Sequence, residues 1–275
     1  MVFDFFKNKR NASKKFEATS AAISAASGLA APFLTSPPSL RNAKRVLFVQ
    51  PHPDDNQIAA GGTIAWLISR GVECWELTVT DDRYAVPEYI GKENEVETLR
   101  QKEAKAAQAC LGMKNAGFLG FADKTTADVH EISRKICEVI REIKPDFVIT
   151  ADPNMANECH SDHIKVGTAV KYACMDSMCD FYPEFIDGKL REDVHKVPAI
   201  GFYYTDKPNT IIDISDFEEK KMQAINCHVS QAEPVLLAAV RLQHHVFAEG
   251  TRYKAVEPLR CQSSLQMHCF ALPIK

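Results

Sequence analysis

The alternation of short apolar runs with longer amphipathic stretches constrains this chain more than any other feature. Residues 45–50 form a run of mostly apolar side chains, which is typical of a strand buried on both faces of a parallel sheet. A stretch with helical character follows over 58–70 and ends at Gly71, a residue favoured just past a helix end. Residues 74–80 then read as a second strand. A strand, a helix and a strand in such close succession are the signature of a βαβ unit.

The same alternation continues along the chain. The next predicted elements are helices over 93–111, 129–143 and 161–178, and strands over 117–119 and 147–150. Alternating strands and helices predict an α/β fold: a Rossmann-like, mainly parallel sheet with helices on both faces. The pattern then changes, with predicted strands over 200–204 and 210–214 and a helix over 217–227. We therefore expect a smaller C-terminal α+β part.

The domain organisation follows from these patterns. The chain has 275 residues and 45% hydrophobic content, which is enough for one large core. We predict an N-terminal extension over 1–42, helical or flexible, with a Pro- and Ser-rich linker at 35–40. A single domain is expected over 43–275, divided into a Rossmann-like core (43–180) and a C-terminal part (181–275).

Composition limits the classes of partner and the cellular location. The formal net charge of −3 does not favour nucleic acid, and no apolar run is long enough to cross a membrane. The nine cysteines are odd in number and contain no C-x-x-C pair, which favours reduced thiols and the cytoplasm. The basic, Ala- and Ser-rich start only loosely follows the order of a secretory signal. A homo-oligomer stays open.

The loop after the first predicted strand carries the strongest functional signal. His52, Asp54 and Asp55 directly follow residues 45–50, and ligands in α/β sheets bind beyond the carboxyl ends of strands. Imidazole and carboxylate groups side by side suit a divalent metal such as zinc. The alternative is a turn whose polar groups are satisfied locally, because Pro and Asp are common in turns.

A second polar cluster follows the strand predicted at 147–150. Its members are Asp152, Asn157, His160, Ser161, Asp162 and His163. A helix that starts here would put His160 and His163 on one side, because they are three residues apart. One of these imidazoles would complete a three-ligand site with positions left for water and substrate, which is the layout of a catalytic zinc.

These motifs, taken in order, resemble the LmbE-like or PIG-L-like N-acetylglucosaminyl deacetylases. The family pattern is H-P-D-D-E, G-G-T, T-D-G, H-P-D-H and C-H-x-S-Q. The matching stretches are His52-Pro53-Asp54-Asp55-Asn56, Gly61-Gly62-Thr63, Thr80-Asp81-Asp82, His160-Ser161-Asp162-His163 and Cys227-His228-Val229-Ser230-Gln231. Arg100, Glu103 and Ala104 fall where the family has R-x-x-E-A. The resemblance covers roughly residues 44 to 260, and the motifs are specific as a set.

The resemblance implies a metal-dependent hydrolase that removes an N-acyl group, the acetyl group above all, from an N-acetylglucosaminyl substrate. It implies a zinc ion, with Fe²⁺ as the alternative, held by His52, Asp55 and His163. It also implies Asp54 as the general base, His160 as the group that polarises or protonates, and Asp162 as the residue that orients an imidazole. Zinc lowers the pKa of a bound water to about 7, and a neighbouring carboxylate can take its proton.

The chain departs from the family pattern at three positions. Asn56 replaces a Glu, Asp82 replaces a Gly, and Ser161 replaces a Pro. The change at Asp82 falls near loops that meet substrate in the family, so it bears most on substrate identity. The glycine pair of the G-G-T motif could hold a phosphate at a helix start, although no full G-x-G-x-x-G is present.

Four further residues are candidate substrate contacts: Arg83, Arg100, Asp123 and His228. Arginine could bind an acidic group, and Asp could bind sugar hydroxyls; solvated surface charge is the alternative for the first three. A structural role is the favoured alternative for His228. Two other functions stay open at this point. One is a zinc amidase for a different N-acyl small molecule, and the other is a non-catalytic sugar-binding module. The base beside the metal argues against the latter.

Overall fold

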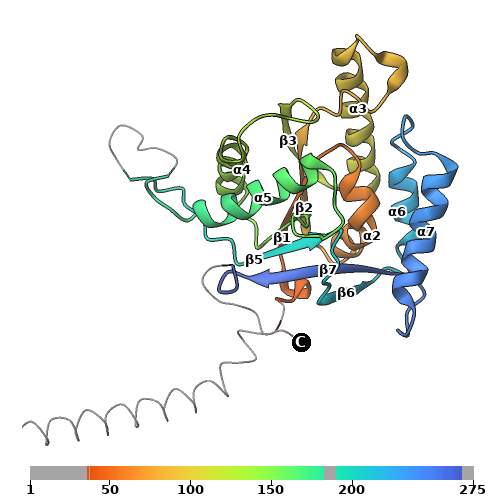
Figure 1. The fold of residues 1–275 in the computed structure, drawn as a ribbon. Coiled ribbons are helices and arrows are strands. Elements are labelled where there is room, and N and C mark those ends of the chain that lie inside the picture. Colours follow the sequence, from red (N-terminus) through yellow and green to blue (C-terminus); the bar gives the residue numbers. More distant parts are fainter. Residues whose placement is uncertain (1–35, 37, 183–189, 268–275) are drawn as a thin grey trace, which may run out of the picture. The chain divides into compact units, whose positions relative to one another are not determined.

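One sheet organises the part of the chain that the computed structural model describes, residues 36, 38–182 and 190–267 (Figure 1). Its strands are β1 Arg45–Gln50, β2 Glu73–Thr80, β3 Lys114–Phe121, β4 Phe147–Ala151, β5 Ala199–Tyr203, β6 Thr210–Asp213 and β7 Val256–Ser263. Their order is β3-β2-β1-β4-β5-β7-β6. The first five strands pair in parallel, whereas β7 runs antiparallel to both β5 and β6. The α/β fold class predicted from the sequence is confirmed.

Helices lie on both faces of this sheet. They are α2 Asp55–Ser69, α3 Glu93–Leu111, α4 Val129–Ile143, α5 Ser161–Asp176, α6 Glu218–Ile225 and α7 Pro234–Ala248, with short 3₁₀ turns η1 Leu40–Asn42 and η2 Pro87–Tyr89. Figure 1 shows α4 and α5 on one side of the sheet and α2, α3 and α6 on the other. The C-terminal helix α7 packs beside α6 and contacts β7.

Strand β1 explains why its sequence reads as an unbroken apolar run. Successive side chains of a strand point to opposite faces. Val46 and Phe48 join the core beneath α2, while Leu47 and Val49 join the core formed with α4 and α5. All four side chains are fully buried. A strand covered on both faces therefore needs apolar residues at every position.

The predicted elements of the core agree with the structure to within a few residues, except that β3 is longer than expected. Two elements of the C-terminal part, α7 and β7, had no sequence prediction of their own. Pro258 disfavoured a strand because proline lacks an N–H donor. In the structure Pro258 pairs with Ile211 of edge strand β6, and the pairing with β5 begins only at Arg260.

The described residues from 38 to 267 belong to one compact unit. Leu40, placed by sequence in the extension, is buried in the core of this unit at 2% exposure. Of the predicted extension, the structure describes Ser36 and residues 38–42, and the other residues lie outside the described part of the chain. The domain boundary at residues 42 and 43 stays a prediction.

The G-G-T motif serves as an internal helix start. Helix α2 is kinked at Ala60, whose φ of −136° is not helical. Beyond the kink, the backbone N–H groups of Gly62 and Thr63 donate to the carboxylate of Glu257, over 2.9 and 2.6 Å. Glu257 also accepts a 2.7 Å hydrogen bond from Lys221. Because these N–H groups bind a carboxylate of the chain itself, the motif offers no phosphate site.

Candidate active site

The polar cluster lies at the point where the strand order reverses. Strand β1 leads through α2 to β2 on one side of it, whereas β4, its neighbour on the other side, leads through α5 to β5 in the opposite direction. This switch point in an α/β sheet leaves a crevice beyond the carboxyl ends of the strands. Residues 51–54 leave the end of β1, and residues 152–160 leave the end of β4. The two sequence motifs therefore meet in one place, as their positions predicted.

The loop after β1 has a constrained backbone. Asp54 has a φ of 143°, a conformation that side-chain-bearing residues rarely adopt, and such strain is common at functional sites. Helix α2 starts at the next residue, Asp55, whose Oδ2 accepts a 2.9 Å hydrogen bond from the backbone N–H of His52. The turn thereby holds the carboxylate of Asp55 against the imidazole of His52.

Asp55 connects two imidazoles. Its Oδ2 lies 3.2 Å from Nδ1 of His52, and its Oδ1 lies 3.3 Å from Nε2 of His163. Each imidazole turns its other nitrogen to a further carboxylate. Nδ1 of His163 is 2.8 Å from Glu158, and Nε2 of His52 is 3.3 Å from Asp162. All five side chains are at most 14% exposed.

These contacts raise the pKa values of the two imidazoles and lower the pKa of the Asp55 carboxyl group. Burial alone lowers the pKa of His52, but hydrogen bonds to three carboxylates outweigh it and hold this pKa well above its usual range. Burial also lowers the pKa of His163, but Asp55 and Glu158 raise it to about 9. Burial raises the pKa of Asp55, yet the two imidazoles hold it well below its usual range. Asp55 is therefore held ionised.

His160 lies against both imidazoles without sharing their carboxylates. Its ring centre is 4.5 Å from that of His52 and 4.7 Å from that of His163. It caps the start of α5, where its Nδ1 accepts the backbone N–H of Asp162 at 3.3 Å. Burial, His52 and His163 all lower its pKa. The structure thus favours a neutral imidazole with its proton on Nε2.

Asp54 is bound by a buried arginine. Arg100 of α3 donates to Asp54 Oδ2 at 2.7 Å and to the carbonyl of Pro53. It also donates to Asp82 at 2.7 Å and to Glu103 at 2.6 Å. Burial raises the pKa of Asp54 to about 7, although Arg100 opposes this, and it raises the pKa of Asp82 to about 6.

A group of carboxylates surrounds the far nitrogen of His52. Asp123 Oδ1 lies 3.4 Å from His52 Nε2, close to the contact that Asp162 makes with the same atom. Oδ1 of Asp162 is buried without a hydrogen-bond partner in the described chain, and Oδ1 of Asp123 makes the long contact with His52. Burial raises the pKa of Asp123, but contacts including those to His52 lower it to about 2. Unsatisfied buried carboxylate oxygens suit a cation.

Within the described residues, two sets of three side chains place one ligand atom each within 4.8 Å of one another. They are His52, His160 and His163, and His52, Asp123 and Asp162. Asp55 contacts two members of the first set. The nitrogen and carboxylate oxygen atoms of these residues are the donors that zinc and related divalent metals prefer. The site therefore fits a divalent metal ion.

Two predicted substrate contacts prove to be interior residues. Arg100 is fully buried, and its donors are occupied by groups of the chain. His228 is 1% exposed, both its ring nitrogens lack a hydrogen-bond partner, and burial lowers its pKa to about 3. Neither side chain is exposed to solvent in this structure. Arg83 pairs with Asp81 and is one-third exposed, and this position is compatible with either of its sequence interpretations.

Two residues of the site were missed from sequence. Glu158 faces His163, and Tyr204 stacks on the same ring with centres 5.7 Å apart and planes at 16°. Tyr204 follows β5 with a φ of 50°, another strained backbone at this edge. Glu158 lies between Asn157 and His160 of the second polar cluster, although it was not counted in it, and Tyr204 carried no signal except its place at a strand end.

Comparison with known proteins agrees with this geometry. The family model described as "PIG-L: GlcNAc-PI de-N-acetylase" matches residues 47–174. The diacetylchitobiose deacetylase of Thermococcus kodakarensis is 34% identical over 230 residues, which cover 77% of this chain and 84% of that protein. The chain belongs to the PIG-L family. It is therefore an enzyme that hydrolyses amide bonds, as the sequence predicted.

Two further proteins are similar over most of the chain. A probable N-acetyl-alpha-D-glucosaminyl L-malate deacetylase 2 of Bacillus cereus is 32% identical, covering 70% of this chain and 86% of that protein. The crystal structure of the N,N'-diacetylchitobiose deacetylase of Pyrococcus horikoshii superposes with a TM-score of 0.75 and 30% identity. It covers 83% of this chain and 87% of that one.

None of the helices in the described residues is long and apolar enough to cross a membrane.

Proposed function

We propose that this enzyme removes the acetyl group from the nitrogen of an N-acetylglucosaminyl substrate, with Asp54 as the general base. The observation that carries the proposal is the buried, metal-type cluster of His52, Asp55 and His163, with Asp54 next to Asp55 in the chain. The related deacetylases support acetyl as the acyl group and an amino sugar as the substrate. They favour this function over an amidase for an unrelated molecule and over a binding module.

We propose His52, Asp55 and His163 as the metal ligands. Metal-bound histidines usually donate their second ring nitrogen to a carboxylate, which fixes the tautomer and the ring plane. His52 and His163 both face Asp55 with one nitrogen and another carboxylate with the second. The alternative ligands are His52, Asp123 and Asp162. In that arrangement Asp55 would not bind the metal and would only contact the imidazoles of His52 and His163.

The metal we propose is Zn²⁺. A two-histidine, one-carboxylate set also suits Fe²⁺, but amide hydrolysis needs no redox change. When bound, zinc supplies a water whose pKa is near 7 and a positive charge for the oxyanion. Metal analysis of the purified protein distinguishes the two ions.

The residues of the chain supply the proton transfers. Asp54, with a pKa of about 7, is suited to accept the proton of the attacking water near neutral pH. The Nε2–H of His160 is free to donate to the oxyanion, since its Nδ1 accepts the N–H of Asp162. Protonated Asp54 can then return a proton to the leaving amine. Asp162 holds the imidazole of His52 through its carboxylate.

The test is acetate release from N-acetylglucosaminyl sugars, with metal and with chelator. The wild-type enzyme should release acetate only with metal. Asp54→Asn should keep the fold and the metal while turnover falls roughly 10²–10⁴-fold, the usual worth of a general base. Near-normal turnover in Asp54→Asn would exclude it as the base. Faster cleavage of longer N-acyl chains than of acetyl would favour the amidase alternative.

Cellular location and oligomeric state remain proposals. The eight cysteines of the described residues are all free, which supports the cytoplasm predicted from their number and spacing. Light scattering of the purified protein would determine whether it forms a homo-oligomer.

A further inference from the structure

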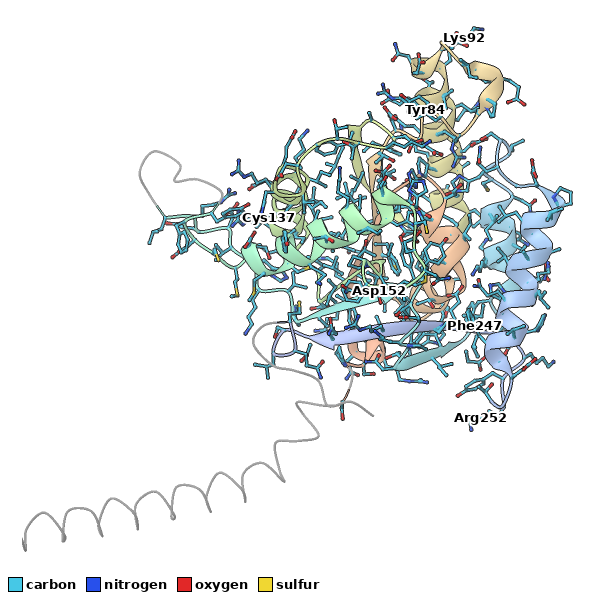
Figure 2. All side chains as sticks on the ribbon, viewed as in Figure 1. Tyr84, Lys92, Cys137, Asp152, Phe247 and Arg252 are labelled. Carbon is cyan, nitrogen blue, oxygen red and sulfur yellow. The ribbon has the colours of Figure 1, made fainter. Side chains whose placement is uncertain are left out.

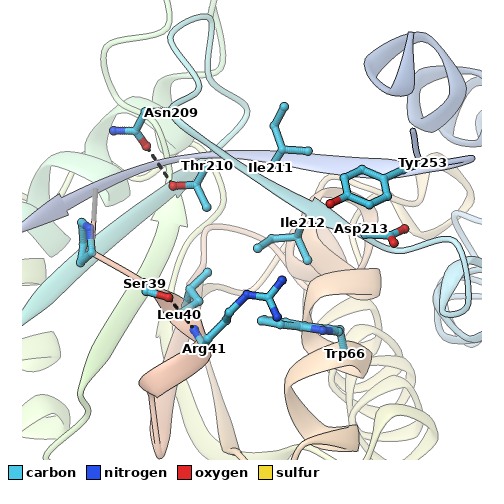
Figure 3. Close-up of a pocket in the computed structure, with 11 residues that line it drawn as sticks. Ser39, Leu40, Arg41, Trp66, Asn209, Thr210, Ile211, Ile212, Asp213 and Tyr253 are labelled. Atoms are coloured by element: carbon cyan, nitrogen blue, oxygen red, sulfur yellow. Dashed lines mark hydrogen bonds between the residues drawn. The ribbon is translucent and has the colours of Figure 1, made fainter. Parts of the chain in front are cut away.

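Three cavities among the described residues differ in the charges that line them. The first, of about 240 Å³, lies between η1, α2 and β6, where the guanidinium of Arg41 sits over the ring of Trp66 (Figure 3). Asp213 also lines it, so it carries charges of both signs. The second, of the same volume, has no charged residue in its described lining. The third, of about 180 Å³, is lined by the cations Lys171 and Arg260 and by no acidic residue of the described chain. The third is therefore the one whose charge selects for one kind of ligand.

The third cavity lies between α5 and the strands β5 and β7. Lys171 comes from α5, and Arg260 and Gln262 come from β7. Asn154 comes from the loop that follows β4. Two apolar side chains are part of the lining, Ile200 and Met267. None of the lining residues is a proposed metal ligand or catalytic group, so the cavity is separate from the catalytic cluster.

The guanidinium of Arg260 is held in place but has little counter-charge. It lies over the ring of Phe202, 5.9 Å from the ring centre. Its Nη1 is 3.5 Å from Oδ2 of Asp152, which is labelled in Figure 2, whereas charge-assisted hydrogen bonds measure about 2.7–2.9 Å. Asp152 instead accepts the hydroxyl of Thr205 at 2.6 Å and the backbone N–H of Asn154 at 2.9 Å. Most of the donors of Arg260 therefore stay available for a ligand.

Lys171 and two side-chain amides add further donors. In the described part of the chain, neither the ammonium of Lys171 nor the amide of Gln262 has a hydrogen-bond or ion-pair partner. The amide of Asn154 makes one long contact, 3.4 Å from Oδ1 of Asp152, and keeps a second N–H. Two cations and two amides thus line one cavity with donors that the described residues leave largely unpaired.

These donors match a phosphate group better than a carboxylate. A phosphate monoester carries about −1.5 to −2 charges at neutral pH, which two cations balance. Arginine binds two phosphate oxygens with its planar fork, lysine acts as a point charge, and amides can donate to the remaining oxygens. Pockets for drug-sized ligands run from about 300 to 1,000 Å³, so a cavity of about 180 Å³ suits one small group.

We propose that the cavity between α5 and β7 is a binding site for a phosphate group, either the free ion or a small monoester. Arg260 and Lys171 supply the positive charge, and Asn154 and Gln262 supply further N–H donors. The proposal is independent of the proposed function, because it uses none of the catalytic residues.

The test is isothermal titration calorimetry of the intact enzyme with inorganic phosphate, in chloride buffer of matched ionic strength. We expect a saturable site, and we expect acetate to bind at least about tenfold more weakly because it carries a single charge. Glycerol phosphate is the second phosphate probe. Tighter binding of glycerol phosphate would identify a monoester as the ligand, and tighter binding of inorganic phosphate would identify the free ion.

Substitutions of the two cations then locate the site. Arg260→Met and Lys171→Met should each weaken phosphate binding at least about tenfold, since each removes a charged donor. Arg260→Lys keeps the charge but loses the fork, so its affinity should lie between those of Arg260→Met and the wild type. Lys207→Met is the matched control, because Lys207 is exposed and does not line the cavity. It removes one positive charge and should leave the affinity unchanged.

Circular dichroism checks that each variant folds; if Arg260→Met does not, Lys171→Met and Arg260→Lys still decide. Absence of saturable phosphate binding in the intact enzyme would overturn the proposal. Full affinity in the cavity variants would overturn it as well, because the phosphate would then bind elsewhere, for example at the catalytic cluster. An equal loss of affinity in Lys207→Met would also overturn it, since net charge rather than the cavity would then determine binding.

Discussion

Replacing Arg100 separates a structural role from a substrate contact. The side chain is fully buried and pairs with three carboxylates, those of Asp54, Asp82 and Glu103, at 2.6 to 2.7 Å. Those carboxylates are themselves at most 15% exposed. In Arg100→Met the apolar stem remains, but three buried acidic groups lose their common counter-charge.

The expected cost is large relative to the stability of a domain. Removing one partner of a buried ion pair typically costs about 3–5 kcal/mol, and whole domains have about 5–15 kcal/mol. We expect Arg100→Met to lose at least about 3 kcal/mol of unfolding free energy. Adding Asp82→Asn should recover part of it, because one of the unpaired carboxylates is then neutral. Asp82 stands where the family pattern has glycine, so this pair is a departure of this chain.

The assay is urea unfolding followed by circular dichroism, with Arg241→Met as the control. Arg241 is 39% exposed and pairs with Glu219 at the surface, so its loss should cost at most about 1 kcal/mol. A substrate contact would behave differently. Unchanged stability in Arg100→Met, together with a raised KM and a normal kcat, would refute the structural role.

Three further predictions concern His160 and Glu158 of the site and Gly62 of helix α2. His160→Ala should lower kcat more than it raises KM and should keep one metal ion per chain; loss of the ion on elemental analysis would make His160 a ligand. Glu158→Gln should weaken metal binding about 10–100-fold in a chelator competition, and unchanged affinity would remove it as the partner of His163. Gly62→Ala should cost about 1–3 kcal/mol in urea unfolding, because its Cβ would lie 2.7 Å from Ile214; a neutral substitution would show that Ile214 can move away.

The fold could be predicted largely from one physical regularity. A strand covered on both faces is apolar throughout, and a helix on a sheet is apolar on one side. Both patterns are strong in β1 and α4, and the predicted bounds of these elements match the structure. Strand β7 was missed because it contains Pro258 and because two short strands share it end to end, so no single pattern runs along it.

The part of the site that could be predicted is the meeting of the two motifs, because their positions at strand ends determine that they lie close together. Motifs that follow β1 and β4 had to meet, because neighbouring parallel strands end at the same edge. The direction of individual side chains was not so determined. Even so, Arg100 and Glu103 share the buried face of α3 with Val96 and Ala107, at helical spacing. That spacing was a signal that Arg100 lies on the buried face of the helix.

The most direct test of the account is a metal titration of chelator-treated enzyme, with bound ion and acetate release measured on the same samples. Activity on an N-acetylglucosaminyl sugar should rise in proportion to bound Zn²⁺ and should saturate at one ion per chain. The His52→Ala, Asp55→Ala and His163→Ala variants should neither bind the ion stoichiometrically nor regain activity. Full activity in metal-free enzyme, or stoichiometric zinc in all three variants, would contradict the account.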